Sequence, residues 1–500
     1  MTVILSGVIS LLLYYLAWII YCLTLHPLAS VPGPFFARIS RLWYLYHVYQ
    51  GDHEIAQRDL HERYCPLIRI APNEVETNDP EAIPIIYPTQ NPLQKTDYYH
   101  VFRPSGLDGR LDMFTQTDEE EHAACVTLFK DRLGEFADHG GEFDFGLWLE
   151  MYTYDVIVAV VFREQFGFFK ERTDYGSYIK SVHTAMPSLS FIGTAPSYVR
   201  PFLLGVALFI PKLLKAVLAV DGIRKNAIRA TEARMKAKAD KRDGHDVLSS
   251  LVRIVEEKGA KKNFSHKEVG VEAWVAVMGG ADSASILLRS IFYYLMKNQE
   301  ALRKVQAEVD QAFESGNFQS PVRHRHVSNL PYLSAVVKEA LRMFPSFQSP
   351  LVRHSPRDGV VLSGTHVPAG YKVGINAGTI QFNKAFFVGP DASSFRPERW
   401  LSPSPSQLAA MNKAMLVFGA GTRQCTGQYL ALVETYKATA VIMKNFDFEL
   451  ADPDREWKTY NAAFNFRRAS LRRCGGESAA RKLDGEGGSM YGGNENDHQR

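Results

Sequence analysis

The longest uninterrupted apolar run lies at the start of the chain. Residues 3–25 contain no charged side chain. As an α-helix this run would be about 34 Å long, enough to cross the hydrocarbon core of a bilayer. A cleaved signal peptide is the alternative, but its apolar region is normally shorter and follows a basic segment. The pattern therefore predicts a transmembrane signal anchor at residues 1–25.

The residues that follow this run predict its orientation. Arg38 and Arg41 come soon after it, and no acidic residue occurs before Asp52. Because positive charge stays on the cytosolic side, we expect a single-pass protein whose body lies in the cytosol. Residues 26–34 contain three prolines, which stop a helix from continuing, so this segment is predicted to be a stiff hinge.

The body of the chain, residues 35–473, mixes helical and strand-like patterns. Helical periodicity dominates from about residue 115 to about residue 345. Two short strands are predicted within 66–80 and a small sheet within 359–378, where glycines mark the turns. The pattern predicts a mainly α fold with small β-sheets, of the α+β class.

Two further segments complete the pattern. No second run is expected to reach the length of a membrane span. Residues 201–211 are apolar but too short to span, so they are predicted to be buried or interfacial. The tail, residues 474–500, is polar and rich in glycine, and is predicted to be disordered.

Composition removes several classes of function. The chain has 57 Lys and Arg against 54 Asp and Glu, and no basic run is interleaved with aromatic residues, so no nucleic-acid partner is expected. The 5 cysteines are an odd number, lie far apart and form no C-x-x-C pair. This argues against a disulfide framework or a structural zinc site and fits a reducing compartment.

The main candidate for chemistry is the segment FGAGTRQCTG, residues 418–427. It has Gln424 where a dinucleotide-binding loop needs its third glycine, and it lacks the G-K-[ST] of a phosphate loop. A zinc site needs companion ligands, yet no other Cys or His lies within about forty residues of Cys425. A cysteine–histidine nucleophile pair stays open, because such partners are distant in sequence. Residues 426–446 have helical composition, so Cys425 would begin a helix, where backbone N–H groups favour a thiolate.

The spacing F-x-x-G-x-R-x-C-x-G resembles the haem-ligand loop of the cytochrome P-450 superfamily. It is met by Phe418, Gly421, Arg423, Cys425 and Gly427. The resemblance implies that the Cys425 thiolate is the axial ligand of the iron in haem b, which favours O–O cleavage. It also implies that Arg423 pairs with a haem propionate, that the glycines let the backbone approach the porphyrin, and that Phe418 packs beside the sulfur. The alternative is a structural cysteine in a turn.

Glu339 and Arg342 lie three residues apart opposite an apolar helical stripe. Such a pair alone is most often an exposed ion pair. Together with Arg399 in FRPERW it resembles the structural E-x-x-R triad of the same family, which supports the haem-side core. Arg353 matches a position that often reaches a propionate.

The segment GGADSAS, residues 279–285, places two glycines inside a helical pattern. Each costs about 1 kcal/mol relative to alanine, so a reason is needed. The resemblance supplies one: a widened groove for dioxygen, followed by the acid–alcohol pair Asp282 and Ser283, which delivers protons. The alternative for Ser283 is a hydroxyl that bonds back to the carbonyl of Gly279.

One position departs from the family pattern. His122 matches a residue that contacts a propionate, but the arginine expected four residues later is Val126. Lys130 lies two turns beyond His122 and is a candidate replacement.

The resemblance covers about residues 26–470 and is closest to fungal, membrane-anchored enzymes of specialised metabolism. It implies a monooxygenase of the endoplasmic reticulum membrane that inserts one oxygen atom of O2 into a lipophilic small molecule. Electrons would come from NADPH through a separate cytochrome P-450 reductase, with cytochrome b5 as an optional second donor. Two alternatives are an electron-independent rearrangement or dehydration, and haem binding without turnover. The family's substrate-pocket positions fall in residues 98–114, 274–278, 348–352 and 461–466.

Overall fold

The computed structural model describes residues 2–64, 66–102, 144–162, 167–174, 177–236, 248, 251–253, 255–257, 266–315, 322–387, 391–450, 452–467 and 477–481. Its α-helices are α1 (Thr2–Ile20), α2 (Phe35–Ile39), α3 (Leu42–Gln50), α4 (His53–Tyr64), α5 (Ile83–Ile86), α7 (Phe145–Phe162), α8 (Phe168–Glu171), α9 (Tyr178–Thr194), α10 (Arg200–Leu208), α11 (Pro211–Lys236), α14 (His266–Lys297), α15 (Gln299–Glu314), α16 (His324–Val327), α17 (Pro331–Met343), α18 (Ala377–Ile380), α19 (Pro405–Ala414) and α20 (Gln428–Asn445).

The strands are β1 (Leu67–Ala71), β2 (Glu74–Thr77), β3 (Arg353–His354), β4 (Val360–Leu362), β5 (Thr365–Val367), β6 (Lys372–Gly374), β7 (Phe446–Leu450), β8 (Thr459–Ala462), β9 (Phe464–Arg467) and β10 (Glu477–Arg481). They form a four-stranded sheet of order β1-β2-β6-β3 and the pairs β4-β5, β8-β9 and β10-β7. Only β2 and β6 in the larger sheet run parallel. The prediction of a mainly helical fold with small sheets is confirmed.

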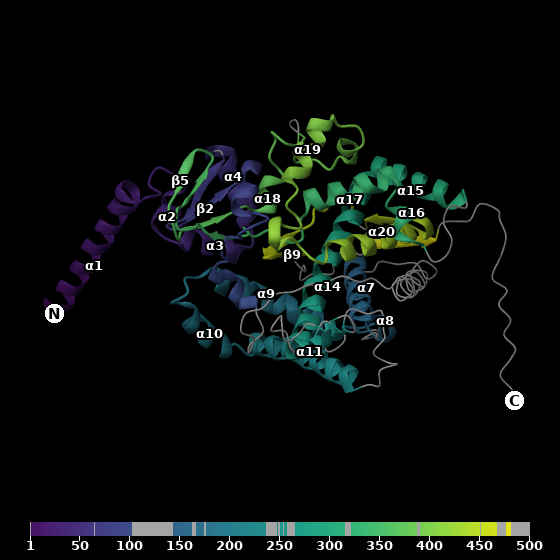
Figure 1. Ribbon diagram of the computed structural model, residues 1–500, viewed down its shortest axis with the longest axis horizontal. Coiled ribbons are helices and arrows are strands. Elements are labelled where there is room, and N and C mark those ends of the chain that lie inside the picture. Colours follow the sequence, from purple (N-terminus) through teal and green to yellow (C-terminus); the bar gives the residue numbers. More distant parts are fainter. Residues whose placement is uncertain are drawn as a thin grey trace.

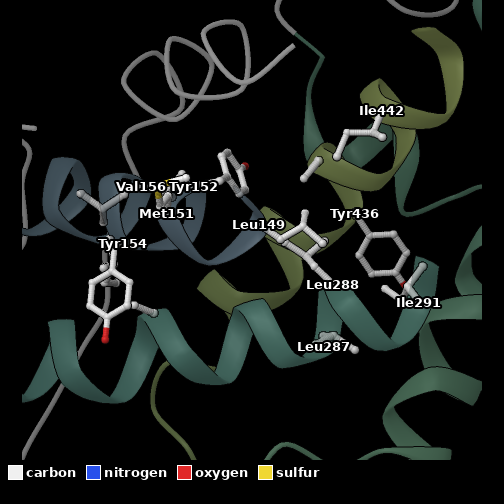
Figure 2. Packing of buried hydrophobic residues seen from close by; sticks show 14 of the residues in the cluster. Leu149, Met151, Tyr152, Tyr154, Val156, Leu287, Leu288, Ile291, Tyr436 and Ile442 are labelled. Carbon is white, nitrogen blue, oxygen red and sulfur yellow. The ribbon is translucent and has the colours of Figure 1, made fainter. Parts of the chain in front are cut away.

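The main hydrophobic core lies where α7, α14, α17 and α20 meet. Leu149 of α7, Leu288 of α14 and Ile442 of α20 are at most 1% exposed, and Figure 2 shows these side chains facing one another. A second core packs the larger sheet against α5, α18 and α19. Figure 1 shows the sheet lobe and the helical lobe side by side.

Hydropathy alone misjudges two of the core helices. Phe145–Phe162 and Glu272–Lys297 are long and apolar enough to span a membrane, contrary to the expectation that only the N-terminal run is. However, 89% and 72% of their most apolar windows are buried inside the protein. Neighbouring helices therefore cover them, and they are core elements of the body.

The N-terminal run behaves differently, because only 6% of its window is buried. Its α-helix ends at Ile20 and a π-helical turn, Tyr21–Leu25, follows. Figure 1 shows α1 projecting from the body as an isolated helix.

Residues 26–34, the predicted stiff hinge, are held against the body. Arg69 of β1 is fully buried and donates hydrogen bonds to the carbonyl oxygens of Cys22, Leu28 and Pro72, at 2.8–3.2 Å. Arg38 donates to the carbonyl of Ala29 at 2.8 Å. The linker is therefore fixed to the larger sheet through its backbone.

Residues 201–211 are predicted to be buried or interfacial. They are not buried, because Phe202 and Phe209 are 70% and 87% exposed on α10 and just after it, and the interfacial alternative stays a prediction. The tail beyond residue 474, predicted to be disordered, contains strand β10, which pairs antiparallel with β7. Residues 477–481 have no Gly or Pro, so their backbone can hydrogen-bond along the edge of β7. The rest of the tail lies outside the described residues.

Glu339 of α17 holds the helical core to the segment before α19. Its carboxylate is fully buried and accepts hydrogen bonds from Arg342 at 2.8 and 3.0 Å, from Arg399 Nε at 2.9 Å and from Trp400 Nε1 at 2.8 Å. The structure thus brings together the three residues of the predicted triad. It also shows that the pair is buried, not the exposed ion pair that spacing alone suggests.

We expect Glu339→Gln to lower the free energy of unfolding by about 3–5 kcal/mol, because it leaves Arg342 and Arg399 as buried charges without their carboxylate. Thermal denaturation measures this loss. Glu300→Gln is the control, since its partner Lys304 is on the surface, and it should leave the melting temperature unchanged. Equal melting temperatures for the two variants would contradict the structural role of Glu339.

Candidate functional site

The candidate site is a cavity of about 640 Å³ between α14 and the loop before α20. Gly279, Gly280 and Ser283 of α14 line it, and Phe418, Arg423 and Cys425 line it from the loop. Ligand sites for small molecules typically measure 300–1,000 Å³. The cavity therefore joins two of the segments that the sequence marks as chemical.

The cysteine loop is shaped by its backbone. Cys425 N–H donates to the carbonyl of Phe418 at 2.7 Å, which closes the turn. Gly419 and Gly421 have φ of +69° and +66°. These values lie in the left-handed region, which residues with a Cβ rarely adopt. At Gly421 a Cβ would also lie 2.2 Å from the carbonyl oxygen of Tyr87, so the loop packs directly on backbone there.

The Cys425 thiol lies next to the start of α20, as expected. Burial raises its pKa, while the backbone N–H groups of Gly427 and Gln428 lower it by less. From the sequence, the helix terminus alone is expected to favour a thiolate. This expectation is not met, because desolvation raises the pKa of Cys425 by more than the N–H groups lower it. A metal ion bound to the sulfur would supply the missing positive charge, since a coordinating thiol is deprotonated outright.

The two glycines of α14 have different roles. A Cβ at Gly279 would meet no atom within 4 Å, so this position opens the helix surface to the cavity. A Cβ at Gly280 would lie 3.0 Å from Ile157 Cδ1, so this glycine lets α7 pack closely. Of the two glycines, only Gly279 widens the groove.

The acid–alcohol pair is split between the cavity and the protein interior. The Ser283 hydroxyl donates to the carbonyl of Gly279 at 2.7 Å, which is the back-bonding that the sequence left open. Its oxygen can still accept a hydrogen bond from the cavity. Asp282 is 1% exposed and accepts a hydrogen bond from the Tyr154 hydroxyl at 3.1 Å. Burial and the negative charge of Glu150 raise the pKa of Asp282 to about 7.

Arg353 lines the same cavity as Cys425. It is buried, donates to the Tyr99 hydroxyl at 2.8 Å, and lies over the Tyr87 ring at 5.1 Å. His122, Val126 and Lys130 lie outside the described residues. Glu339, Arg342 and Arg399 do not reach the cavity wall and form the buried network described above.

The structure adds two residues that sequence reasoning missed. Lys95 lines the cavity with Arg353, and its Nζ lies 4.9 Å from the ring of Tyr99, which belongs to the predicted substrate segment 98–114. Glu434 of α20 also lines the cavity, and burial raises the pKa of this carboxyl well above its usual value. No local pattern marks these residues, because each reaches the cavity only through the packing of its element.

The cavity has features that a haem b group requires. Its wall is mostly apolar, as a porphyrin ring needs, and the described residues supply three cations, Lys95, Arg353 and Arg423, for two propionates. A single thiol, Cys425, is available as an axial ligand. The residues present therefore fit the group.

The four predicted substrate segments contribute to the wall in part. Tyr99, Val275, Ala276, Ser349, Leu351 and Phe464 line the cavity, and they come from all four segments. Residues 103–114 lie outside the described residues. Apart from Tyr99 and Ser349 these side chains are apolar, so the cavity suits a lipophilic molecule.

Comparison with known proteins agrees with a haem group in this cavity. A family model described as cytochrome P-450 matches residues 116–471. The cytochrome P-450 monooxygenase gsfF of Penicillium aethiopicum is 36% identical over 485 residues, covering 92% of this chain and 96% of that protein. The monooxygenase ACRTS1 of Alternaria alternata is 45% identical over 340 residues, covering 68% of this chain and 89% of that protein. A pisatin demethylase of Fusarium vanettenii is 30% identical, covering 90% and 89%.

We expect Gly421→Ala to destabilise the loop more than Gly419→Ala. Both residues have positive φ, which costs an alanine about 1–2 kcal/mol, but at Gly419 the nearest atom to a Cβ is 3.7 Å away. At Gly421 the collision with Tyr87 adds to this strain. Thermal denaturation of the two variants tests the difference, and equal losses would show that the close approach at Tyr87 is not limiting.

Proposed function

Because the chain belongs to the cytochrome P-450 family, we propose that it is a haem-thiolate monooxygenase in which Cys425 binds the iron of haem b. The observation that carries this proposal is the Cys425 thiol at the wall of an apolar cavity, with the Gly279 groove of α14 lining the same space. The reaction inserts one oxygen atom of O2 into a lipophilic small molecule. The fungal origin of the relatives supports a place in fungal specialised metabolism.

The residues around the haem have distinct tasks. Bound haem would supply oxygen activation, and the Cys425 thiolate would ligate its iron and tune it. Arg353, Arg423 and Lys95 would bind the propionates, with the Tyr99 hydroxyl accepting a hydrogen bond from the Arg353 guanidinium and orienting it. His122 is assigned to a propionate by its sequence position. Phe418 packs beside the sulfur, and Gly421 and Gly427 allow the loop to approach the ring.

Proton supply belongs to α14 in this proposal. Asp282 changes protonation near neutral pH, since burial and Glu150 raise its pKa to about 7. The Ser283 hydroxyl accepts a hydrogen bond from the cavity while it donates to Gly279. General acid catalysis by a positioned group of this kind contributes about 10²–10⁴-fold to rate. Electrons come from NADPH through a cytochrome P-450 reductase, with cytochrome b5 as a possible second donor.

We further propose that residues 1–25 anchor the protein in the endoplasmic reticulum membrane, with 26–34 as the linker and 35–473 as the cytosolic catalytic domain. Two observations support this arrangement. The helix α1 is exposed and apolar. A second apolar surface, formed by α10 and the start of α11, exposes Phe202, Leu208 and Phe209 at the same end of the body as α1 (Figure 1).

The reduced protein with carbon monoxide should show the strongly red-shifted Soret band of an axial thiolate. Cys425→Ala should abolish this band, because it removes the only described thiol on the cavity wall. Cys22→Ala is the control and should retain the band. Cys22 is buried in the π-helical turn Tyr21–Leu25, just before the linker, and does not line the cavity. A haem-loaded, folded parent protein without the band would overturn the proposal. Product formation without NADPH would instead indicate an electron-independent rearrangement.

Deletion of residues 2–20 should leave residual binding to phospholipid vesicles, because α10 still offers an apolar surface. Adding Phe202→Asp and Phe209→Asp should reduce vesicle binding by about tenfold or more, since each substitution removes exposed apolar area. Sedimentation with vesicles measures this. Leu401→Asp in the same deletion background is the control, because Leu401 precedes α19, which Figure 1 places across the body from α10. Equal binding of all three variants would show that α10 does not contact lipid.

A further inference from the structure

A buried polar cluster lies behind the groove of α14, between α7, α9 and α14. Glu150 of α7 is 2% exposed, and its Oε1 accepts a hydrogen bond from His183 Nε2 of α9 at 2.7 Å. Its Oε2 accepts a hydrogen bond from Arg289 of α14. Arg289 also donates to the carbonyl of Gly146 at 2.9 Å. Both oxygens of this carboxylate therefore have a cationic or polar partner.

Asp282 belongs to the same cluster. A carboxylate oxygen of Glu150, a ring nitrogen of His183 and a carboxylate oxygen of Asp282 all lie within 4.8 Å of one another. Oδ1 of Asp282 accepts the Tyr154 hydroxyl, whose ring points from α7 toward α14 in Figure 2. Oδ2 is buried and has no hydrogen-bond partner among the described residues. This oxygen is available to take a proton.

The cluster connects the cavity wall with a half-exposed position. His183 retains 33% of its side-chain exposure and packs on the Phe466 ring at 4.7 Å. It is not among the described residues that line the cavity, whereas Ser283, next to Asp282, is. A proton that enters at His183 can therefore reach α14 without crossing the substrate space.

The same three side chains could hold a metal ion, but the contacts favour a proton. His183 Nε2 and Glu150 Oε1 lie at hydrogen-bond distance, and Glu150 is already paired with the permanent cation Arg289. A divalent ion at this place would lie beside that guanidinium and would have to displace the imidazole proton. The site therefore holds positive charge before any metal arrives.

Charge in the cluster is arranged for transfer near neutral pH. Burial opposes ionisation of Glu150, but Arg289 and His183 outweigh it and lower the pKa of Glu150 to about 2. Burial lowers the pKa of His183, yet the bond to Glu150 and its charge raise it by more. The described titratable groups that face this site are Asp144, which precedes α7, Glu150 and Tyr154 on α7, Tyr178 and His183 on α9, and Asp282 and Arg289 on α14.

We propose that His183 passes protons from solvent to Asp282, with Glu150 and Arg289 as positioning residues that hold the imidazole in place. In this step the N–H bond of the imidazolium breaks and an O–H bond forms at Oδ2 of Asp282. The two side chains approach within 4.8 Å, a distance that one water molecule can bridge. Solvent then returns a proton to the imidazole, so no other reactant is consumed. The inference rests on the proposed function, because it names the source of the protons that Asp282 delivers.

The first test measures protonation directly, in the full-length ferric protein without substrate or NADPH. An infrared difference titration should show protonated carboxyl absorption with midpoints near pH 7, where Glu54 also titrates, and the component that Asp282→Asn removes is the band of Asp282. His183→Gln should move the midpoint up by roughly half a pH unit or more, because a positive charge near Asp282 is lost. Thr184→Val, the neighbouring residue on α9, should leave the midpoint unchanged. A midpoint that does not move in His183→Gln would overturn the proposal.

The second test measures the use of protons in turnover. In His183→Gln the product formed per NADPH should fall by about tenfold or more, with hydrogen peroxide formed instead, and the solvent isotope effect should rise. The carbon monoxide band should be unchanged, because the haem ligands are intact. An unchanged amount of product per NADPH in His183→Gln would overturn the proposed relay. One bound zinc or manganese per chain, lost in His183→Gln, would overturn it in favour of a metal site. If the parent protein lacks the thiolate band, the proposed function fails. The infrared midpoint in His183→Gln still shows whether His183 interacts with Asp282.

Discussion

The buried carboxylate of Glu339 is the contact on which the arrangement of the two lobes depends. Its hydrogen-bond donors come from α17 itself and from residues 396–400, so the helical core and the segment before α19 share one charged centre. A carboxylate without these donors would be costly in the interior. The chain that follows α17 forms part of the cavity wall, and the chain that follows residue 400 leads to the cysteine loop. Both sides of the cavity are thus positioned from the same helix.

The helix α14 carries two functions on different faces. Toward the cavity it presents Gly279 and the Ser283 hydroxyl, where the absence of a side chain leaves space. Toward α7 and α9 it presents Arg289, which pairs with Glu150, and Asp282, whose Oδ1 accepts the Tyr154 hydroxyl. The interior face therefore carries the buried charged groups, while the cavity face stays open. The cavity and the buried charges thus lie on different faces of the same helix.

The sequence predicts the features that are set by short-range constraints. The cysteine loop could be predicted because its turn needs glycine at positive φ, and Gly421 packs directly on the Tyr87 carbonyl. The hairpin of β1 and β2 follows for a similar local reason. The buried Glu339 network does not, because spacing alone indicates an exposed ion pair and Arg399 is distant in sequence. Features set by packing could not be predicted. Hydropathy does not distinguish a helix covered by neighbours from one in lipid, so α7 and α14 resemble spans although they are buried. For the same reason the pattern of residues 201–211 leaves open whether they are buried or interfacial, and only the structure shows that α10 is exposed. Lys95, Glu434 and His183 likewise owe their positions to helices and loops distant in sequence, and the pKa of Cys425 follows from burial more than from its helix terminus.

The attachment of the linker has an evolutionary consequence. Arg69 reaches the main-chain carbonyl of Leu28, a kind of acceptor that every residue type possesses. The side chain at Leu28 can therefore change among residues that fit the space without removing this hydrogen bond. Arg69 itself has less freedom, because a lysine has no planar fork to reach several carbonyls at once. The contact thus constrains the residue type at position 69 more strongly than the residue types of the segment that it holds.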